Sequence, residues 1–323
     1  MTKLPLVALA PAKINLGLFL GPTRADGRHE LATVMQSISL ADELTLTAAD
    51  PAAAGDGRTA RGGDTPATVH GDVVVCPGVA GAAEDNLAAR ALAAFREATG
   101  WDAPPLRLSI VKQVPVAAGL GGGSGDAAAA LRLAATASGL GDEELLAGLA
   151  RALGADVPAQ VQPGRWLAGG AGEVLRQLPD PIVALGVLVL PVARALSTAD
   201  VYAQADRMGL ARDRAELGEA HRALAAALAD GSPLPPAELL RNDLEEAARA
   251  LCPEIDAALL EARSAEADAT LLSGSGPTVL GLFAGSRGPA RVRAAARALA
   301  ERVPAPIAAE PVVAGFARPA ASR

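Results

Sequence analysis

The stretch PVAAGLGGGSGDAAAALR, residues 115–132, joins a cluster of glycines directly to a run of alanines. A glycine cluster permits positive φ angles, and it lets successive backbone N–H groups point into one concavity that binds anions. Alanine is the strongest helix former, so the cluster opens onto a helix whose first N–H groups and dipole favour phosphate. We expect Ser124 and Asp126 to lie at the cap of this helix. The segment therefore predicts a phosphate-binding loop and not a flexible linker.

Two common phosphate-loop signatures do not fit this stretch. A Walker loop needs Gly-Lys followed by Ser or Thr, whereas the three lysines, Lys3, Lys13 and Lys112, follow Thr, Ala and Val. The dinucleotide pattern Gly-x-Gly-x-x-Gly fails because the place of its last glycine holds Ser124 in one register and Asp126 in the other. The loop therefore belongs to a third class.

Length and composition indicate two domains that share a cleft. The 323 residues exceed one typical domain, and half of them are hydrophobic, mostly Ala, Leu and Val. A glycine-rich passage at residues 164–172 marks the expected boundary, which we place between an N-terminal domain of residues 1–167 and a C-terminal domain of residues 168–323. The predicted N-terminal domain carries the glycine loop.

Charge and cysteine usage restrict the partners and the compartment. The formal net charge of -7 argues against nucleic acid or an anionic membrane as the main partner. Cys76 and Cys252 lie far apart with no CxxC motif, and the sequence shows no signal segment and no apolar run long enough to span a membrane. We therefore expect a cytoplasmic protein that holds anionic ligands through local donors.

The order of expected elements favours the α+β class over a doubly wound sheet, because strands and helices are mixed without strict alternation. We expect one or two strands over 6–21, broken at Pro11, and two strands over 32–48 around a turn at Ala41 and Asp42. Residues 50–71 form a low-complexity insert, which we expect to be a mobile loop. The remaining expectations are a strand at 72–76, a helix at 84–100 capped by Asp85 and ended by Gly100, a strand at 106–115, helices at 126–140 and 142–154, a buried strand at 183–191, four helices from residue 197, and a strand, a turn and a strand around 271–283 followed by a helix and the strand 307–315.

Three segments, PAKINLGL at 11–18, PVAAGLGGGSGDAAA at 115–129 and SGSGPT at 273–278, resemble the three signature motifs of the GHMP small-molecule kinases in order and spacing. The resemblance spans nearly the whole chain. It implies a two-domain fold, with an N-terminal domain like domain 2 of ribosomal protein S5 and a ferredoxin-like C-terminal domain. It also implies that ATP and a small-molecule substrate bind in the cleft between them.

Within that superfamily, ADGRHEL at 25–31 and GADVP at 154–158 resemble the branch whose substrate is 4-diphosphocytidyl-2-C-methyl-D-erythritol. Mevalonate kinases usually have a glycine where Ala12 stands, and homoserine kinases lack the lysine at the place of Lys13. The resemblance implies phosphorylation of the C2 hydroxyl by ATP, giving the 2-phosphate and ADP, in the non-mevalonate route to isopentenyl diphosphate. The alternatives are a kinase for another small alcohol and a non-catalytic nucleotide sensor, and the presence of both Lys13 and Asp156 argues against the sensor.

Lys13 and Asp156 are the implied catalytic residues. A lysine in an apolar strand is otherwise an edge-strand charge or a side chain that reaches solvent, and an aspartate between Gly154 and Pro158 is otherwise a turn residue. Matched to the family motifs, Asp156 is the base that accepts the hydroxyl proton, and Lys13 stabilises charge near the transferring phosphoryl group.

The implied nucleotide site contains the glycine loop and two residues outside it. Asn86 resembles a nucleotide contact but also fits a helix start, and Lys112 resembles another but also fits a solvated strand position. Mg²⁺ is the implied metal, with ligands that the sequence leaves open: Ser124 or Asp126 is possible, and Asp126 fits a helix cap equally well. The loop residues are Pro115, Val116, Ala117, Ala118, Gly119, Leu120, Gly121, Gly122, Gly123, Ser124 and Gly125.

The implied substrate side comprises Asn15, Arg28, His29, Thr198 and Tyr202. His29 is expected to read the edge of cytosine, although it also fits a solvated turn. Tyr202 is expected to cover one face of the base, although it also fits simple helix packing. Arg28 stands where the family usually carries an aromatic residue, and we hypothesise that its planar guanidinium covers the other face. We expect a monomer or a weak homodimer.

Overall fold

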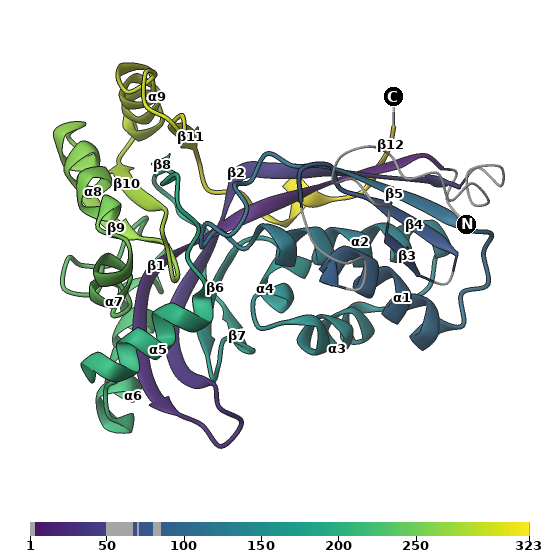
Figure 1. Ribbon diagram of the computed structural model, residues 1–323, viewed down its shortest axis with the longest axis horizontal. Helices are drawn as coiled ribbons and strands as arrows, with labels where there is room; N and C mark the ends of the chain where they lie inside the picture. The colour runs from purple at the N-terminus through teal and green to yellow at the C-terminus, as the bar shows by residue number, and fades with distance from the viewer. Residues whose placement is uncertain (1–3, 50–66, 70, 80–84, 323) are drawn as a thin grey trace.

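The computed structural model describes residues 4–49, 67–69, 71–79 and 85–322. Two antiparallel-rich sheets and their helices form its two halves, and the long strands β1 and β2 run from one half into the other (Figure 1). The first half contains β1 (Leu6–Thr23), β2 (His29–Ala48), β3 (Ala67–Val69), β4 (Asp72–Val75), α1 (Leu87–Thr99), β5 (Leu106–Val111), α2 (Gly122–Ser138), α3 (Glu143–Leu153), α4 (Val157–Val161), β6 (Arg165–Gly169) and β7 (Val174–Gln177).

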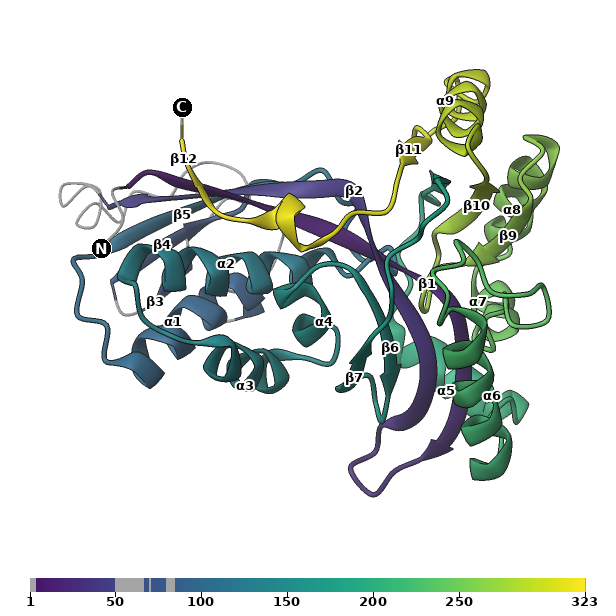
Figure 2. The same cartoon turned by 180° about the vertical axis from the view of Figure 1, so that it is seen from behind.

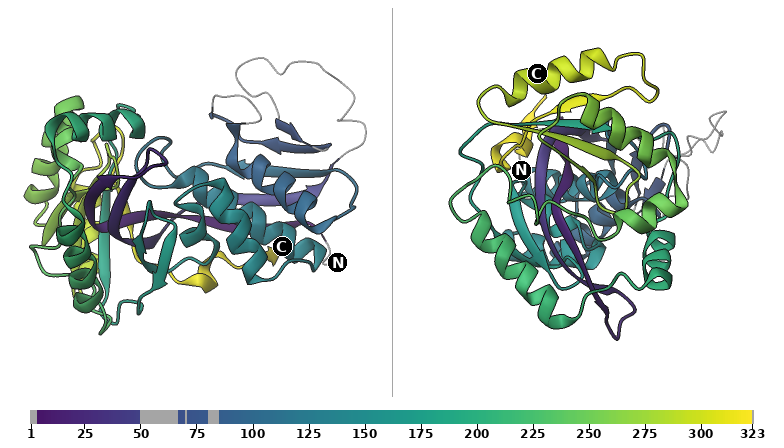
Figure 3. Two further views of the ribbon diagram at one scale, coloured as in Figure 1. Left: turned by 90° about the horizontal axis from the view of Figure 1, so that it is seen from below. Right: turned by 90° about the vertical axis from the view of Figure 1, so that its left-hand side faces the viewer.

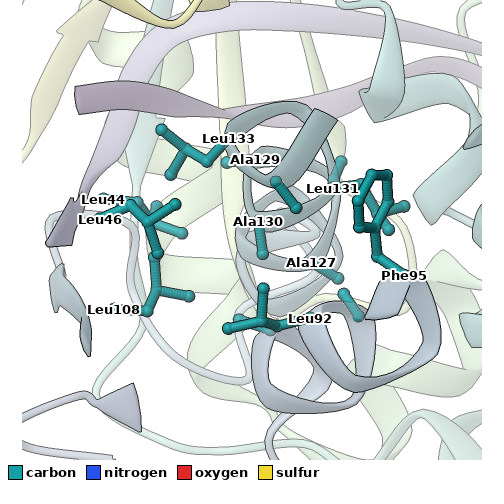
Figure 4. Packing of buried hydrophobic residues seen from close by; sticks show 14 of the residues in the cluster. Leu44, Leu46, Leu92, Phe95, Leu108, Ala127, Ala129, Ala130, Leu131 and Leu133 are labelled. Atoms are coloured by element: carbon teal, nitrogen blue, oxygen red, sulfur yellow. The ribbon is translucent and has the colours of Figure 1, made fainter. Parts of the chain in front are cut away.

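The first sheet has the strand order β12-β1-β2-β5-β4-β3, and β6 joins it by pairing with β2 and β7. The only parallel pair among its described strands is β4 with β5. Helix α2 packs on β1 and β2 and is surrounded by α1, α3 and α4. Its alanines let α1 approach closely, and Leu92 and Phe95 of α1 belong to the same buried cluster as the leucines of β2 and β5, with Phe95 and those leucines on opposite sides of α2 (Figure 4). This packing fixes the helix that follows the glycine loop.

The second half contains a four-stranded antiparallel sheet in the order β11-β8-β10-β9. Numbered along the chain from β8, this order is 4-1-3-2, the arrangement of a ferredoxin-like split βαβ fold. Its elements, together with the two short C-terminal ones, are β8 (Leu185–Leu190), α5 (Thr198–Met208), α6 (Arg214–Ala227), α7 (Glu245–Leu251), α8 (Glu254–Ser264), β9 (Ala269–Leu272), β10 (Val279–Ala284), α9 (Gly288–Ala298), β11 (Ile307–Ala309), η2 (Ala314–Ala317) and β12 (Ala320–Ala321).

Strand β8 is buried on both faces, which explains its uninterrupted apolar sequence. Val187 and Val189 pack into a core shared with β1, β2 and α6, whereas Leu188 and Leu190 pack under α7, α8 and α9. The second sheet therefore lies between those helices and the long β1–β2 hairpin (Figure 3). The predicted buried strand and the four helices after it are confirmed.

The chain returns to the first half at its C-terminal end, where β12 pairs with β1 (Figure 2). Strand β6 contains residue 167 and β7 follows it, and both strands pair within the first sheet. The division of the chain at 167/168 stays a prediction. The first sheet contains strands from both sides of this position, whereas the second sheet contains only strands that follow it.

Two expectations for the first strands were wrong. β1 continues through Pro11, and the irregularity there is a shift of pairing register between Pro11 and Lys13, not a break. β2 is one strand over 20 residues with no turn at Ala41 and Asp42, because the carboxylate of Asp42 is satisfied inside the fold. A polar residue in mid-strand therefore imitated a turn signal.

The low-complexity insert lies mostly outside the described residues. Its described end differs from the expectation of a loop, because residues 67–69 form β3 and pair with β4.

Candidate active site

A cavity of about 700 Å³ opens between the two halves. The predicted glycine loop forms one wall, β1 and the start of α4 form the floor, and α5 with the turn between β9 and β10 forms the opposite wall. Apart from the loop, the lining includes the predicted residues Lys13, Asn15, Asn86, Lys112, Asp126, Asp156, Thr198 and Tyr202. Segments far apart in the sequence thus bring most of the predicted site together.

Lys13 and Asp156 form an ion pair in this cavity. The Lys13 Nζ lies 3.3 Å from Asp156 Oδ2 and donates a hydrogen bond of 2.9 Å to Asn15 Oδ1. The lysine side chain is 8% exposed and the aspartate 32%, so the ammonium is held by protein while the carboxylate stays reachable from the cavity. Lys13 is therefore not a side chain that reaches solvent, and Asp156 lies in the turn before α4, where its carboxylate lines the cavity.

The register shift in β1 gives Lys13 its place. The pairing of β2 with β1 is interrupted between Ser37 and Ala41. The Lys13 N–H therefore donates to the Leu120 carbonyl of the glycine loop, at 2.9 Å. Asn15 continues the polar row by donating to Thr33 Oγ1, which donates to the Gly17 carbonyl. The lysine is therefore tied to the loop through its backbone and to β1 and β2 through Asn15.

The glycine loop has the conformation that its sequence predicts. Ala117, Gly119 and Gly121 have φ angles of 53°, 73° and 66°, in the left-handed region. Helix α2 begins at Gly122 with Gly121 as its N-cap, so the first turn of the helix lies inside the glycine cluster. The expected cap at Ser124 and Asp126 was wrong. Since the helix starts earlier, Ser124 lies in its first turn and Asp126 in its second.

The turn that carries SGSGPT packs against this loop. Ser273 Oγ donates to the Gly119 carbonyl at 3.1 Å, and a Cβ on Gly119 would lie 2.2 Å from the Ser273 carbonyl oxygen. Asn242 holds the turn from behind by donating to the carbonyls of Leu272 and Gly274. The glycines of both motifs thus permit a close backbone contact between the two halves.

Lys112 lies in a buried ion-pair cluster and not on a solvated strand. Its Nζ donates to Asp126 Oδ2 at 2.7 Å and also to Asp42 Oδ2. Burial lowers the pKa of this ammonium, but the two carboxylates outweigh that effect and raise it. Burial and the charge of Asp42 raise the pKa of Asp126 to about 7, against the opposing effect of Lys112. Asp126 Oδ1 is buried without a hydrogen-bond partner among the described atoms.

Asn86 lines the cavity and also caps α1. Its side-chain oxygen accepts from the N–H groups of Ala88 and Ala89 at 2.9 and 3.3 Å. The expected cap at Asp85 was therefore wrong, because the helix begins one residue later. Gly100 ends the helix with a φ of 64°, as expected.

The predicted substrate residues lie around α5. Thr198 Oγ1 shares a hydrogen bond of 3.0 Å with Ser275 Oγ, and burial, with the charge of Asp156, raises the pKa of the Tyr202 hydroxyl. The His29 ring lies 5.2 Å from the Tyr202 ring and bonds Asp206 Oδ1 through Nε2 at 2.8 Å. His29 is buried behind Tyr202, so it is not the solvated turn histidine that its local sequence allows.

Arg28 is not brought to the site in this conformation. Its side chain is 55% exposed and bonds Asp26 at 2.9 and 3.2 Å. The described lining of the cavity includes neither Arg28 nor His29, nor Gly125 of the loop. Gly125 faces Gln160 and the Pro11 carbonyl instead.

Sequence reasoning missed three polar residues that support the site. Asp42 binds Lys112, Gln160 donates to the Gly121 carbonyl at 2.9 Å, and Asn242 holds the SGSGPT turn. All three lie outside the family motifs, and their partners are 30 to 70 positions away. Asp42 gave a local signal, an aspartate within a strand-like segment, but that signal was interpreted as a turn.

Comparisons with known proteins agree with this geometry. Residues 86–164 match the family described as GHMP kinases N terminal domain, and residues 221–305 match GHMP kinases C terminal. The 4-diphosphocytidyl-2-C-methyl-D-erythritol kinase of Anaeromyxobacter sp. (strain K) is 40% identical over 295 residues, which cover 88% of this chain and 83% of that protein. The enzyme of the same name from Streptomyces coelicolor (strain ATCC BAA-471 / A3(2) / M145) is 40% identical and covers 89% of this chain and 91% of its own. The chain belongs to the 4-diphosphocytidyl-2-C-methyl-D-erythritol kinase family.

Solved structures support the same assignment. A crystal structure of 4-(cytidine 5'-diphospho)-2C-methyl-D-erythritol kinase matches with a TM-score of 0.69 and 32% identity, covering 94% of this chain and 98% of that one. A homoserine kinase from Cytophaga hutchinsonii ATCC 33406 matches with a TM-score of 0.68 at 15% identity, which shows a shared fold alone. The predicted α+β GHMP kinase fold is therefore confirmed, and the chain is a small-molecule kinase of this family.

Two features are absent from the part of the chain that the structure describes. None of their helices combines the length and the hydropathy that crossing a membrane requires. No cluster of three or more His, Cys, Asp or Glu side chains suited to a metal ion occurs among them.

Proposed function

We propose that this kinase transfers the γ-phosphoryl group of ATP to the C2 hydroxyl of 4-diphosphocytidyl-2-C-methyl-D-erythritol, giving the 2-phosphate and ADP in the non-mevalonate route to isopentenyl diphosphate. The observation that carries the proposal is the Lys13–Asp156 pair at 3.3 Å, in one cavity with the glycine loop. The named relatives at 40% identity support the choice of acceptor.

Asp156 is the base in this proposal. Its exposed carboxylate accepts the proton of the acceptor hydroxyl as the oxygen attacks the γ-phosphorus, while the bond from that phosphorus to the ADP oxygen breaks. Lys13 is held by Asn15 and the loop, so its charge would lie beside both the reacting hydroxyl and the transferring group. Phosphoryl transfer needs mainly positioning and charge stabilisation, which this pair and the loop N–H groups supply.

The loop residues and the start of α2 would hold the nucleotide phosphates, with Asn86 and Lys112 at the same wall. Mg²⁺ would neutralise charge on the phosphate oxygens when bound. Ser124 and Asp126 both line the cavity, and Asp126 Oδ1 has no described partner, so their oxygens fit a hard cation. These two residues are therefore the proposed protein ligands.

The acceptor would lie on the other side of the Lys13–Asp156 pair, near Asn15, Thr198 and Tyr202. Tyr202 is proposed to cover one face of cytosine and His29, which touches its ring, to read the edge of the base. Arg28 would have to release Asp26 before its guanidinium could cover the second face of the cytosine ring. We further propose a cytoplasmic protein, in keeping with the free thiols of Cys76 and Cys252.

A coupled ADP-release assay across a panel of small alcohols tests the proposal. We expect turnover with the cytidyl diphosphate substrate and none with homoserine, mevalonate or galactose. Equal turnover with another alcohol would assign the chain to a different acceptor. ATP binding without turnover of any alcohol would support a sensor.

A further inference from the structure

A buried carboxylate at Asp42 lies beneath the start of the phosphate loop and has no part in the proposed chemistry. Its residue is fully buried in β2 and is absent from the described lining of the cavity. Asp42 Oδ1 accepts the N–H groups of Gln113 and Val114 at 2.6 and 2.8 Å, and Oδ2 accepts from Lys112 Nζ. One carboxylate therefore binds three consecutive residues between the end of β5 and the loop.

The same ammonium reaches the far end of the loop. Lys112 precedes the loop and Asp126 follows it in the second turn of α2, and their side chains meet at 2.7 Å. We name Asp42, Lys112 and Asp126 the loop clasp. It closes residues 113–125 at both ends and ties them to β2, a strand that also supports the floor of the cavity.

We propose that Asp42 is a positioning residue that, through the loop clasp, holds the phosphate loop in the conformation that receives the nucleotide. The inference rests on the proposed function in one respect, namely that a nucleotide phosphate is the ligand of the loop. If the loop backbone is not already ordered in the free protein, it must become ordered when the nucleotide binds. The entropy lost in that step weakens the affinity for the nucleotide. Removal of Asp42 from the clasp should therefore weaken ATP binding. The affinity for the acceptor and the rate of the chemical step should stay nearly unchanged.

The chain supplies a matched control at the other end of β5. Asp72 is 2% exposed, binds Arg96 through both carboxylate oxygens at 2.6 and 2.8 Å, and accepts the Leu106 N–H at 2.8 Å. Asp42 and Asp72 are thus two buried carboxylates that each pair with a cation and accept backbone N–H groups, Asp42 just after the end of β5 and Asp72 at its start. Only Asp42 is attached to the loop, so a general loss of stability should affect both variants and a loss of loop geometry only one.

The experiment compares Asp42→Asn with Asp72→Asn in steady-state kinetics and in hydrogen exchange of the full-length kinase. We expect Asp42→Asn to raise the KM for ATP about 5- to 20-fold, with kcat and the KM for the acceptor within about 2-fold of wild type. We also expect faster exchange at residues 113–125 without nucleotide. Asp72→Asn should lower the melting temperature but leave the KM for ATP and the exchange of the loop unchanged.

Several results would overturn the proposal. An unchanged KM for ATP in Asp42→Asn would do so, as would an equal rise in Asp72→Asn, which would indicate general loosening. If Asp42→Asn does not fold, Asp42→Glu carries the same test, because it keeps the charge but displaces it by one methylene group. An unchanged KM for ATP in that variant would also overturn the clasp. Failure of the wild type to bind ATP would instead overturn the proposed function.

Discussion

Lys13 and Asp156 are the residues on which the proposed chemistry depends. We predict that Asp156→Asn and Lys13→Met each lower kcat by roughly 10²-fold or more, the general scale for a positioned base or charge. The Asp156 carboxylate is partly exposed, and Lys13 is its only ion-pair partner among the residues that the structure describes, so the fold and ATP binding should survive. Single-turnover rates and ATP titrations measure the two effects separately. Wild-type turnover in either variant would remove that residue from the mechanism.

Asp126 should make the stability of the fold depend on pH. Its pKa is raised to about 7 in the folded protein, whereas an unfolded aspartate has a pKa of about 3.9. Between these values the folded chain holds a proton that the unfolded chain releases, so the free energy of unfolding falls as pH rises, by up to about 1.4 kcal/mol per pH unit. Asp126→Asn removes this dependence.

Urea unfolding at about pH 5 and about pH 7, without nucleotide or metal, checks this prediction. Asp126→Asn should gain stability relative to wild type as the pH increases. A difference between the two proteins that is the same at both pH values would show that Asp126 is ionised throughout.

Arg28 is the residue whose role the sequence leaves most open. If its guanidinium leaves Asp26 and stacks on cytosine, Arg28→Ala should raise the acceptor KM about 5-fold or more, and Arg28→Tyr should restore much of the loss. The KM for ATP should stay within about 2-fold of wild type in both variants. A normal acceptor KM in Arg28→Ala would leave the arginine as a surface residue paired with Asp26.

At the scale of elements, helix α2 has a left-handed glycine at each end, which separates backbone strain from the function of the loop. Gly121 and Gly139 have φ angles of 66° and 73°. A Cβ on Gly121 would lie 2.9 Å from Lys13 Cγ and 2.8 Å from Gln160 Nε2, whereas one on Gly139 would meet nothing within 4 Å. Both substitutions to alanine incur a strain of roughly 1–2 kcal/mol.

We therefore predict that Gly121→Ala weakens ATP binding and lowers turnover, and that Gly139→Ala lowers only the melting temperature. Isothermal titration with ADP and thermal unfolding measure the two effects. Equal nucleotide affinity in the two variants would show that the loop tolerates a side chain beside Lys13.

Local sequence predicted the elements that carry their own signals. The alanine run after the glycines predicted α2, and the apolar run VLVL predicted β8. Asp42 misled the prediction because its partner Lys112 is 70 positions away, and no local rule reveals a buried ion pair at that separation. The cap of α2 was misplaced for a related reason, since only packing against Gln160 and β1 shows that the helix can start among glycines.

At the scale of the whole molecule, the site exists only where the two halves meet. The family motifs predicted most of the cavity-lining residues named above, though not the absence of Arg28, His29 and Gly125 from the lining. The contact of Ser273 with Gly119 and the support from Asn242 depend on how the second sheet packs on the first half. Sequence patterns describe segments and not their packing, which explains why the motifs were found and their supports were missed.

The identity of the acceptor that the kinase phosphorylates decides whether the proposed function is right. The measurement is ADP release with ATP and 4-diphosphocytidyl-2-C-methyl-D-erythritol, with ³¹P NMR of the product, compared with the same reaction of Asp156→Asn. We expect turnover only with the cytidyl substrate, a new phosphomonoester at its C2 oxygen, and a loss of roughly 10²-fold or more in the variant. Phosphorylation of a different alcohol, or full activity of Asp156→Asn, would contradict it.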